Sequence, residues 1–497
     1  MNFLSYTIVS LALVLGSCSN TVPKSCVVDD DYPRPASLCN ETHKPNITLT
    51  RSSTESPKPL SSSQKLTLAD VLLRVIDSNP DVGIAGAREK EQSAAIEAAK
   101  AARLPSLDLS MSAGPQHIFW PSPGGDAVRK EASIGVKQVL FDFGATKNDI
   151  SRAEMAYASA SASRVAKTED VAFQVLKTYL KVLQADDQIR ITQENIAAHS
   201  SILNLVELRE KNGNGTLADI KRITTRLENA KAVLIDLTTQ RADAAAAFEN
   251  LTLINADKVD PTILKSLKGQ PEKIDRDIIE ANPLLTSLKQ ELASLEYQLA
   301  SAKAEKLPSI GLQGSVRASQ NVSSSEDGDD QFAVYGLVTV RLPVFDGGLN
   351  NAKQNQIRSR IEATHYKLEK ERRSLWEDSR NAMRVTTTDG ARSGSLEARV
   401  AAAKKVADLN LEQFRSGSKS VFELLDGQAD YFKAKSDVVG QVYSRMEAEI
   451  RALQLRGQLV RAILGLPVQS HLDFNKNQPT YQSVQYSSSL PGVKIIQ

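Results

Sequence analysis

Apolar residues return every seven positions over long stretches of this chain. Two series with that spacing are Val175, Val182, Ile189, Ile196 and Leu203, and Leu425, Phe432, Val439, Met446, Leu453 and Val460. Strict sevens predict long α-helices that pack along one apolar seam, as in a coiled coil. A helix of about 60 residues is roughly 90 Å long, so its seam needs an equally long partner, which an antiparallel return helix provides. We predict long helices over about 147–209, 216–252, 351–415 and 419–465.

Four shorter segments alternate apolar and polar residues, which predicts β-strands with one polar face. In the first of them, Leu107, Leu109 and Met111 are separated by Asp108 and Ser110. Strands of about ten residues are long enough to cross a membrane at a tilt, although a soluble hairpin on a helical protein has the same pattern. Four strands cannot close a barrel alone, so the membrane interpretation requires an oligomer. The predicted strands cover about 106–114, 132–141, 309–320 and 332–345.

The chain is one unit written twice, with an offset of 203 or 204 residues. Four landmarks keep this offset in the same order, which chance matches would not do, so they predict an internal duplication. The matching sequences are Asn79-Pro80 and Asn282-Pro283, Leu104-Pro105-Ser106 and Leu307-Pro308-Ser309, Phe141-Asp142-Phe143-Gly144 and Phe345-Asp346-Gly347-Gly348, and Gly213, Thr216 and Asp219 with Gly417, Ser420 and Glu423.

Each copy has the same predicted order of elements: a helix, a β-hairpin and a long helical hairpin. The first helix covers about 67–103 in one copy and about 278–306 in the other, and both end before a Leu-Pro pair. The predicted fold class is therefore mainly α with membrane β. We predict a first repeat over 65–255, a linker over 256–277, a second repeat over 278–466 and a polar tail over 467–497.

The first 17 residues form a predicted signal peptide, since Ile8–Leu15 is a short apolar run followed by Gly16, Ser17 and Cys18. Small residues before a cysteine resemble the lipobox of bacterial lipoprotein precursors, in which the cysteine is lipidated. No Lys or Arg precedes the run, and the alternative is an ordinary secretory signal with a chance cysteine. We predict lipidated Cys18, an outer-membrane destination permitted by Ser19, and a flexible tether over 18–64. Cys26 and Cys39 are left as a pair, and a disulfide between them is allowed but not required.

Composition and charge exclude several classes of function. The chain has 61 basic and 59 acidic residues and 5% aromatics. This balanced charge lacks the excess of basic residues that is typical of nucleic-acid-binding proteins. The five histidines are scattered without metal-ligand spacing, and we find no phosphate-binding glycine loop and no Gly-x-Ser-x-Gly sequence. We therefore predict no enzyme activity, no catalytic residues, no cofactor and no metal.

The repeat with its landmarks resembles the TolC-like family of outer-membrane factors over roughly Lys65–Leu466. The specific features are Leu-Thr-Leu-Ala-Asp at 66–70 with Asn79-Pro80, the Leu-Pro-Ser breaks, the Phe-Asp-x-Gly turns and the Gly-x-x-[Ser/Thr]-x-x-[Asp/Glu] sequences at 213 and 417. The resemblance implies a homotrimer in which each chain gives four strands to a twelve-stranded β-barrel, continuous with a periplasmic α-barrel. It also implies an outer-membrane location, a chain extending into the periplasm, and two protein partners: a periplasmic adaptor and an inner-membrane transporter, ABC-type or proton-driven. The predicted lipid anchor rests on the lipobox at Cys18.

The resemblance also points to functional positions. It places adaptor docking at the two helix-to-helix tips, where Gly213 and Gly417 would permit left-handed or tight backbone; plain helix caps are the alternative. Asp408 matches an acidic residue that constricts the pore in the best-known members, although a solvated helical Asp is an equally good interpretation. Leu411 stands where those members carry a second acid. The tip residues are Gly213, Thr216, Asp219, Gly417, Ser420 and Glu423.

The predicted function is a duct for export from a tripartite transporter. The sequence of the second tip, residues 413–426, is more similar to the branch that secretes proteins by the type I route. Multidrug efflux is the alternative, favoured by the lipobox. A further alternative from another class is a helical periplasmic scaffold lipoprotein that forms no channel.

Overall fold

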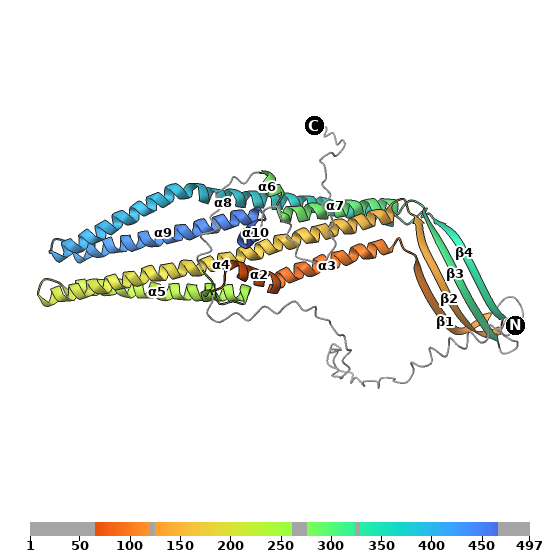
Figure 1. Ribbon diagram of the computed structural model, residues 1–497, viewed down its shortest axis with the longest axis horizontal. Helices are drawn as coiled ribbons and strands as arrows, with labels where there is room; N and C mark the ends of the chain where they lie inside the picture. The colour runs from red at the N-terminus through yellow and green to blue at the C-terminus, as the bar shows by residue number, and fades with distance from the viewer. Residues whose placement is uncertain (1–64, 119–124, 261–275, 324–328, 466–497) are drawn as a thin grey trace, which may run out of the picture. The chain divides into compact units, whose positions relative to one another are not determined.

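The computed structural model describes residues 65–118, 125–260, 276–323 and 329–465 (Figure 1). The chain divides into two units, residues 1–62 and 63–497, and all described residues belong to the second. The predicted signal peptide, the tether with Cys18, Cys26 and Cys39, most of the predicted linker and the whole polar tail lie outside the described residues.

The elements occur in the same order in both copies, and the duplicated fold is confirmed. The first copy contains α2 (Leu68–Ser78), α3 (Pro80–Ala101), β1 (Ser106–Ile118), β2 (Gly125–Phe141), α4 (Ala145–Lys211), α5 (Leu217–Thr252) and the short η2 (Ala256–Lys258). The second contains α6 (Arg276–Glu280), α7 (Pro283–Ala304), β3 (Ser309–Ser323), β4 (Asp329–Arg341), α8 (Leu349–Arg415), α9 (Val421–Leu455) and α10 (Leu459–Leu464).

The helix predicted over about 67–103 is two helices, because the Asn-Pro pair ends one and starts the next. Asn79 caps α3 by accepting a hydrogen bond from the Asp81 N–H at 3.0 Å. Pro80 occupies the first helical position, where its missing N–H costs nothing. Asn282 repeats this cap on α7, accepting from the Leu284 N–H at 2.9 Å. The duplicated Asn-Pro landmark is therefore a helix start.

The Phe-Asp-x-Gly sequences begin the two longest helices. The Asp142 carboxylate accepts hydrogen bonds from the N–H groups of Gly144 at 3.1 Å and Thr146 at 2.7 Å. Asp346 accepts from Gly348 and Asn350, both at 2.9 Å. A carboxylate at this position satisfies backbone donors that have no partner within the helix and favours the positive helix end. Both α4 and α8 then run for 67 residues.

The four strands form one antiparallel sheet in the order β1-β2-β3-β4. Ser106 pairs with Lys137 across β1 and β2, and Ser309 pairs with Arg341 across β3 and β4. Several predicted strand boundaries were wrong: β1 ends at Ile118 rather than near 114, β3 ends at Ser323 rather than near 320, and β4 begins at Asp329 rather than near 332. β2 begins at Gly125 rather than near 132, because hairpin pairing continues towards the turn. β4 ends at Arg341 rather than 345, where Leu342-Pro343 follows and proline cannot donate to a ladder.

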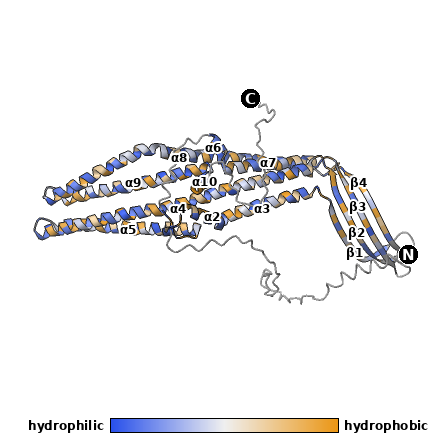
Figure 2. Cartoon of the chain, viewed as in Figure 1, coloured by the Kyte–Doolittle hydropathy of each residue, from blue (hydrophilic) through white to orange (hydrophobic). Residues whose placement is uncertain are grey.

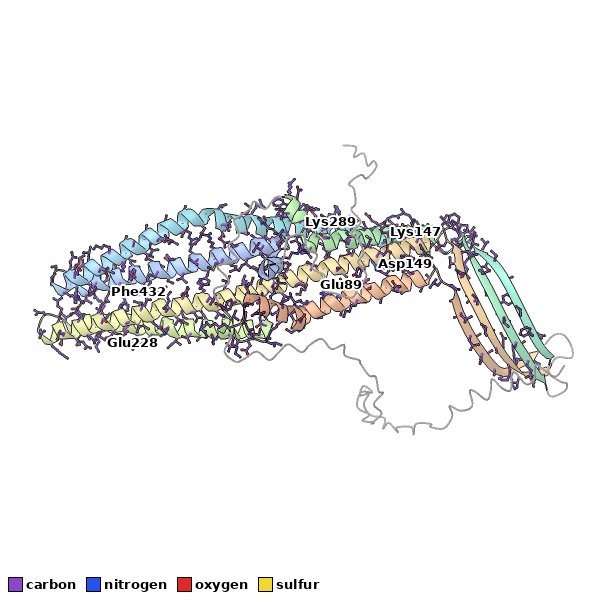
Figure 3. The ribbon with its side chains drawn as sticks, in the orientation of Figure 1. Glu89, Lys147, Asp149, Glu228, Lys289 and Phe432 are labelled. Atoms are coloured by element: carbon purple, nitrogen blue, oxygen red, sulfur yellow. The ribbon has the colours of Figure 1, made fainter. Side chains whose placement is uncertain are left out.

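The helices pack as two long hairpins side by side. α4 contacts α3, α5, α7 and α9, and α8 contacts α7 and α9, so α4 lies at the centre of the packing (Figure 1). Every residue of the two apolar series with seven-residue spacing is buried or half-buried, as the spacing predicts. Polar contacts add to the packing, as where Arg164 of α4 donates to Glu89 of α3 at 2.7 Å. Glu89 is labelled on α3 in Figure 3. Apolar and polar residues alternate around the helices (Figure 2).

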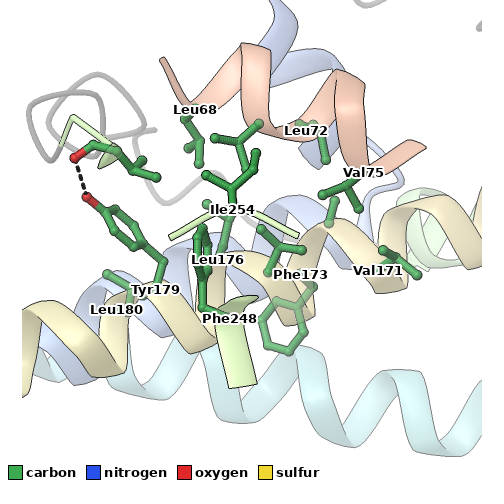
Figure 4. Close-up of a cluster of buried hydrophobic side chains, with 14 of the residues drawn as sticks. Leu68, Leu72, Val75, Val171, Phe173, Leu176, Tyr179, Leu180, Phe248 and Ile254 are labelled. Atoms are coloured by element: carbon green, nitrogen blue, oxygen red, sulfur yellow. Dashed lines mark hydrogen bonds between the residues drawn. The ribbon is translucent and has the colours of Figure 1, made fainter. Parts of the chain in front are cut away.

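The largest apolar core contains residues from the beginning and the end of the first copy and from the end of the second. Leu68 and Val75 of α2 pack with Leu176 of α4 and Phe248 of α5 (Figure 4). The Tyr179 hydroxyl donates to the Val259 carbonyl at 3.1 Å, which satisfies a buried polar group. Leu459 and Val460 of α10 belong to the same cluster.

The helix predicted over 419–465 is also two helices. α9 ends at Leu455, and Gly457 has a positive φ of 65°, which no α-helix contains. α10 restarts at Leu459, where Glu169 of α4 accepts hydrogen bonds from the N–H groups of Leu459 at 2.9 Å and Val460 at 3.3 Å. A side chain nearly 300 positions away thus caps this helix, which no local pattern could predict.

Candidate functional site: two helical tips and a two-faced sheet

The first tip joins α4 to α5 through a turn built on glycine. Gly213 has a φ of 75°, and the Asn214 N–H donates to the Arg209 carbonyl at 2.8 Å, which closes the end of α4. Thr216 caps α5, its hydroxyl accepting from the Asp219 N–H at 3.2 Å. The Asp219 carboxylate accepts from the Thr216 N–H in return, which completes a capping box.

The second tip repeats this design between α8 and α9. Gly417 has a φ of 85°, and the Ser418 N–H donates to the Gln413 carbonyl at 2.8 Å. Ser420 and Glu423 form the capping box of α9. Lys419 donates to Glu423 at 3.0 Å, and this bond together with those from Ser420 lowers the pKa of Glu423 to about 2. The motif shared by the tips is thus explained as turn and cap chemistry.

The two tips meet in an apolar cluster. Val206 and Ile223 from the first hairpin lie with Phe414 and Leu424 from the second, all nearly or fully buried. Arg209 adds a specific tie, donating to the Phe414 carbonyl at 2.7 Å with its guanidinium 4.6 Å from the ring centroid. The sequence did not predict this contact, because it joins residues 205 positions apart through no repeated pattern.

Exposed apolar side chains lie close to both tips. Leu208 and Leu217 of the first tip are 57% and 64% exposed, and Phe422 of the second is 56% exposed. Leu217 and Phe422 stand in the first turns of α5 and α9, beside caps whose polar groups are already satisfied, and Leu208 stands in the last turn of α4. These side chains are therefore available for contact with another protein, whereas Thr216, Asp219, Ser420 and Glu423 serve their own helices.

Asp408 lies on α8 six residues before Phe414, with its side chain exposed between buried Ala407 and Asn410. Asn410 donates to the Glu423 carbonyl at 2.9 Å and so joins α8 to α9. Leu411 is partly buried against the tip cluster rather than exposed beside Asp408. Of positions 408 and 411, only position 408 therefore presents an acidic side chain on the exposed face of α8.

The sheet separates apolar and polar side chains onto opposite faces. The pairing places Leu109, Ile134, Val316 and Val334 in one row across the four strands, and Ser110, Ser133, Arg317 and Ala333 in the next row on the other face. Many apolar side chains of the first face are strongly exposed, including Leu107, Leu109, Met111, Phe332, Val334, Val338 and Val340. A patch of this extent is unusual on a soluble monomer and marks contact with lipid or protein.

β1 and β4 are the two edges of this sheet, since each pairs with a single neighbour within the described residues. Their outer backbone groups therefore lack sheet partners in one chain, which is costly where water is excluded. A sheet that is exposed and apolar on one face needs its edges paired if it is to lie in lipid.

A buried carboxyl lies where the two copies meet. Glu169 is 2% exposed, and burial raises its pKa to about 7, although the N–H groups of Val460 and Leu459 and nearby Arg461 favour the charged form. The group caps α10, so its environment is explained by the fold. Among the described residues, no cluster of His, Cys, Asp or Glu could hold a metal ion. Within the same residues, no helix has both the length and the apolar character needed to cross a membrane.

Comparison with known proteins identifies the family. The model of the family "Outer membrane efflux protein" matches residues 71–252 and 276–458, the two copies in turn. The outer membrane efflux protein BepC of Brucella suis is 22% identical over 84% of this chain and 90% of its own. The alkaline protease secretion protein AprF of Pseudomonas aeruginosa is 25% identical over 67% of this chain and 71% of its own.

A solved structure supports the fold. The outer membrane protein VceC of Vibrio cholerae superposes with a TM-score of 0.69 and 16% identity, covering 79% of this chain and 96% of that one. The matched family segments account for most of the described residues, and the family is one of channels rather than enzymes. The chain therefore belongs to the TolC-like outer membrane efflux protein family and is an outer-membrane efflux channel.

Proposed function

We propose that three copies of this chain form one duct for export. The observation that best supports this proposal is the sheet, which has one apolar and one polar face and two edges that are unpaired among the described strands. In a closed ring, β1 of one copy pairs with β4 of the next, so that twelve strands close a barrel with no edge. The exposed apolar face then contacts lipid and the polar face lines the lumen. The helices continue the duct into the periplasm: at 1.5 Å per residue, α4 and α8 are each about 100 Å long.

Cysteine cross-linking tests the arrangement of the strands. In a chain lacking its native cysteines, Ser110→Cys on β1 combined with single cysteines along β4 is expected to give disulfide-linked trimers on a non-reducing gel. The control joins Ser110→Cys to Ser133→Cys, whose hydroxyls are 2.7 Å apart within one chain, and should give no linked oligomer. Monomers with every β4 partner would contradict the barrel.

The tips are proposed to dock a periplasmic adaptor that connects the duct to an inner-membrane transporter, either ABC-type or proton-driven. The exposed Leu217 and Phe422 beside the satisfied caps support this proposal. Bulky substitution of both Gly213 and Gly417 should abolish export and leave trimers intact. Because such changes strain the turns themselves, Leu217→Ser with Phe422→Ser gives a second test that leaves backbone and caps unchanged. Normal export by both double variants would remove the docking role.

The exposed Asp408 is proposed as a gate residue. In a trimer, three copies would form an acidic ring near the tips that favours cations by its field. Asp408→Ala should lower cation selectivity and raise conductance if the ring constricts the pore. Lys404→Ala, one turn away on the same exposed helix face, is a control of opposite charge and should move selectivity the other way. An unchanged channel in Asp408→Ala would leave a solvated helical acid.

The lipid anchor is proposed at Cys18, with the barrel as the main attachment to the outer membrane. Intact-mass measurement of the mature protein should show acylation at Cys18 and loss of residues 1–17. A free thiol or cleavage elsewhere would contradict the anchor. Cys18→Ser should leave the trimer in the outer membrane, because a closed barrel holds itself in lipid.

The cargo is proposed to be a secreted protein, with drug efflux as the second candidate. The sequence of the second tip, residues 413–426, supports secretion, and the similarity to a protease secretion protein agrees. The similarity to an outer membrane efflux protein supports drug efflux as the second candidate. In a deletion strain, secretion predicts loss of one large protein from the medium with drug sensitivity unchanged. Broad drug hypersensitivity with an intact set of secreted proteins would overturn the proposal.

A further inference from the structure

A cluster of three charged side chains occupies the polar face of the sheet. Arg129 and Glu131 lie two residues apart on β2, and Arg317 comes from β3, where it pairs with Ser133. Arg129 contacts one Glu131 oxygen through Nε at 3.1 Å and Nη2 at 2.6 Å. Arg317 contacts the other oxygen through Nε at 3.1 Å. One carboxylate therefore holds two guanidinium groups from neighbouring strands side by side.

The cluster presents positive charge to solvent. The Arg129 and Arg317 side chains are 45% and 44% exposed, whereas the Glu131 side chain between them is 19% exposed. Arginine keeps its proton at any physiological pH, so two cations against one anion leave a net positive charge. A water-facing surface with this composition attracts anions and repels cations at short range.

Among the side chains that the structure describes on this face, the neighbouring charges do not cancel this excess. On the same face, the other charged side chains that the structure describes are Asp108, Lys137 and Arg341, which add one acid and two bases. The register places Lys130, next to Glu131, on the opposite face with the apolar residues. The two faces therefore carry charge independently at the same height of the sheet.

We propose that Arg129, Glu131 and Arg317 form an anion-favouring selectivity site in the lumen of the barrel. The inference rests on the proposed trimer, in which the polar faces turn inward and three clusters surround the path of the cargo. Small anions, and carboxylate or phosphate groups on larger cargo, are the chemical class that such a ring favours. Glu131 acts as the positioning residue, because it fixes both guanidinium groups while it limits their net charge.

Reversal potentials in planar lipid bilayers under a potassium chloride gradient test the site. Arg129→Gln with Arg317→Gln is expected to lower the chloride-to-potassium permeability ratio by at least about twofold, the order for unit charges a few ångströms from ions in a water-filled pore. Glu131→Gln should raise the ratio, which gives a second variant with the opposite sign. Lys130→Gln removes the same charge at the same height on the other face and should leave the ratio unchanged.

The outcomes separate this inference from the function on which it rests. Channels whose permeability ratio is the same in wild type, the double arginine variant and Glu131→Gln would overturn the selectivity site alone. An equal shift in Lys130→Gln would also overturn it, because the effect would then follow total charge rather than the polar face. The absence of channels from the wild-type trimer would overturn the proposed function together with this inference.

Discussion

The two long hairpins share a frame but differ in what fills their seams. α4 and α8 have the same length, both tips use a left-handed glycine and a capping box, and residues 204 positions apart correspond. In the first hairpin, the matching positions 185 and 237 are buried Ala185 and Leu237. In the second they are buried Asp389 and Gln441, which are hydrogen-bonded to each other at 2.6 Å.

The same replacement occurs near the tips. Val206 and Ile223 of the first hairpin correspond to Asn410 and Gly427 of the second, and the Asn410 amide occupies the space beside the glycine. A Cβ on Gly427 would lie 2.7 Å from Asn410 Nδ2. The two copies therefore share lengths, turns and caps, while at these positions the second hairpin has polar contacts where the first has apolar packing.

The two hairpins are therefore stabilised by different kinds of interaction. Apolar packing is non-directional and tolerates sliding, whereas a buried hydrogen-bonded acid fixes one register and is costly when its partners are lost. Arg445 also donates to Asp389 at 2.6 Å, so the acid is paired with a base that is itself half exposed. We expect the first hairpin to respond to lost volume and the second to lost hydrogen bonds.

The largest expected effect is a cavity in the first hairpin. Ile223 is fully buried in the cluster between the tips, so Ile223→Ala should lower the free energy of unfolding by about 2–4 kcal/mol. Urea unfolding of the detergent-solubilised protein, followed by circular dichroism, measures this change. The control Ile235→Ala, at a residue 66% exposed on the same helix, should cost well below 1 kcal/mol. Equal effects would show that the seam does not hold this hairpin.

The second effect separates hydrogen bonding from volume. Asp389→Ala should cost about 2 kcal/mol, because it leaves Gln441 and Arg445 without their buried acceptor. Adding Gln441→Leu makes both positions match Ala185 and Leu237, and we expect most of the loss to be recovered. If the double variant is less stable than Asp389→Ala, the lost hydrogen bonds are not what destabilises the single variant.

A smaller effect depends on pH at the junction of the copies. The pKa of Glu169 is about 7 in the folded state against 4.5 in the unfolded state, so the folded state binds more protons between these values. Stability from this group is complete below pH 4.5 and is lost as pH rises through about 7. Glu169→Gln cannot ionise and should match wild type near pH 4.5.

Above pH 7 the same variant should be more stable by about 1–2 kcal/mol, since one pKa unit corresponds to about 1.4 kcal/mol and relaxation reduces the full effect. Thermal unfolding at pH 5 and pH 8 measures the difference. Glu228→Gln, at an exposed residue paired with Lys231 at 2.8 Å, should show no comparable pH dependence. A variant equal to wild type at both pH values would mean that Glu169 does not titrate in this range.

The smallest effect should be equal in both hairpins. Thr216→Ala and Ser420→Ala remove the same cap, so each should cost about 1 kcal/mol. Hydrogen exchange at the first turns of α5 and α9 would detect the local opening. A much larger loss in one tip would show that the turn chemistry has also diverged between the copies.

The parts of the fold that local chemistry sets could be predicted from the sequence. Asn79-Pro80 and Thr216 with Asp219 act within a few residues, and the alternation around Leu107 needs only a sheet with one polar face. The duplicated order therefore followed from residues close together in the chain. The ends of β2 and β4 did not, because pairing with a neighbouring strand extends or stops a strand.

Contacts between the copies could not be predicted. Arg209 corresponds to Gln413 and Phe414 to Glu210, so the tie between the tips has no repeated counterpart. Asp389, Gln441 and Glu169 were indistinguishable in sequence from acids and amides on solvated helix faces. Likewise, Arg129, Glu131 and Arg317 meet only because β2 pairs with β3.

Single-channel recording tests whether this chain forms a duct. Purified wild-type trimers added to planar lipid bilayers are predicted to give discrete current steps of reproducible size, because the polar faces of the sheets would enclose a water-filled lumen in the proposed barrel. The same recording is made with trimers from which the helical tips have been removed. If both proteins bind the bilayer stably but neither carries current, the result would contradict a duct and indicate a scaffold.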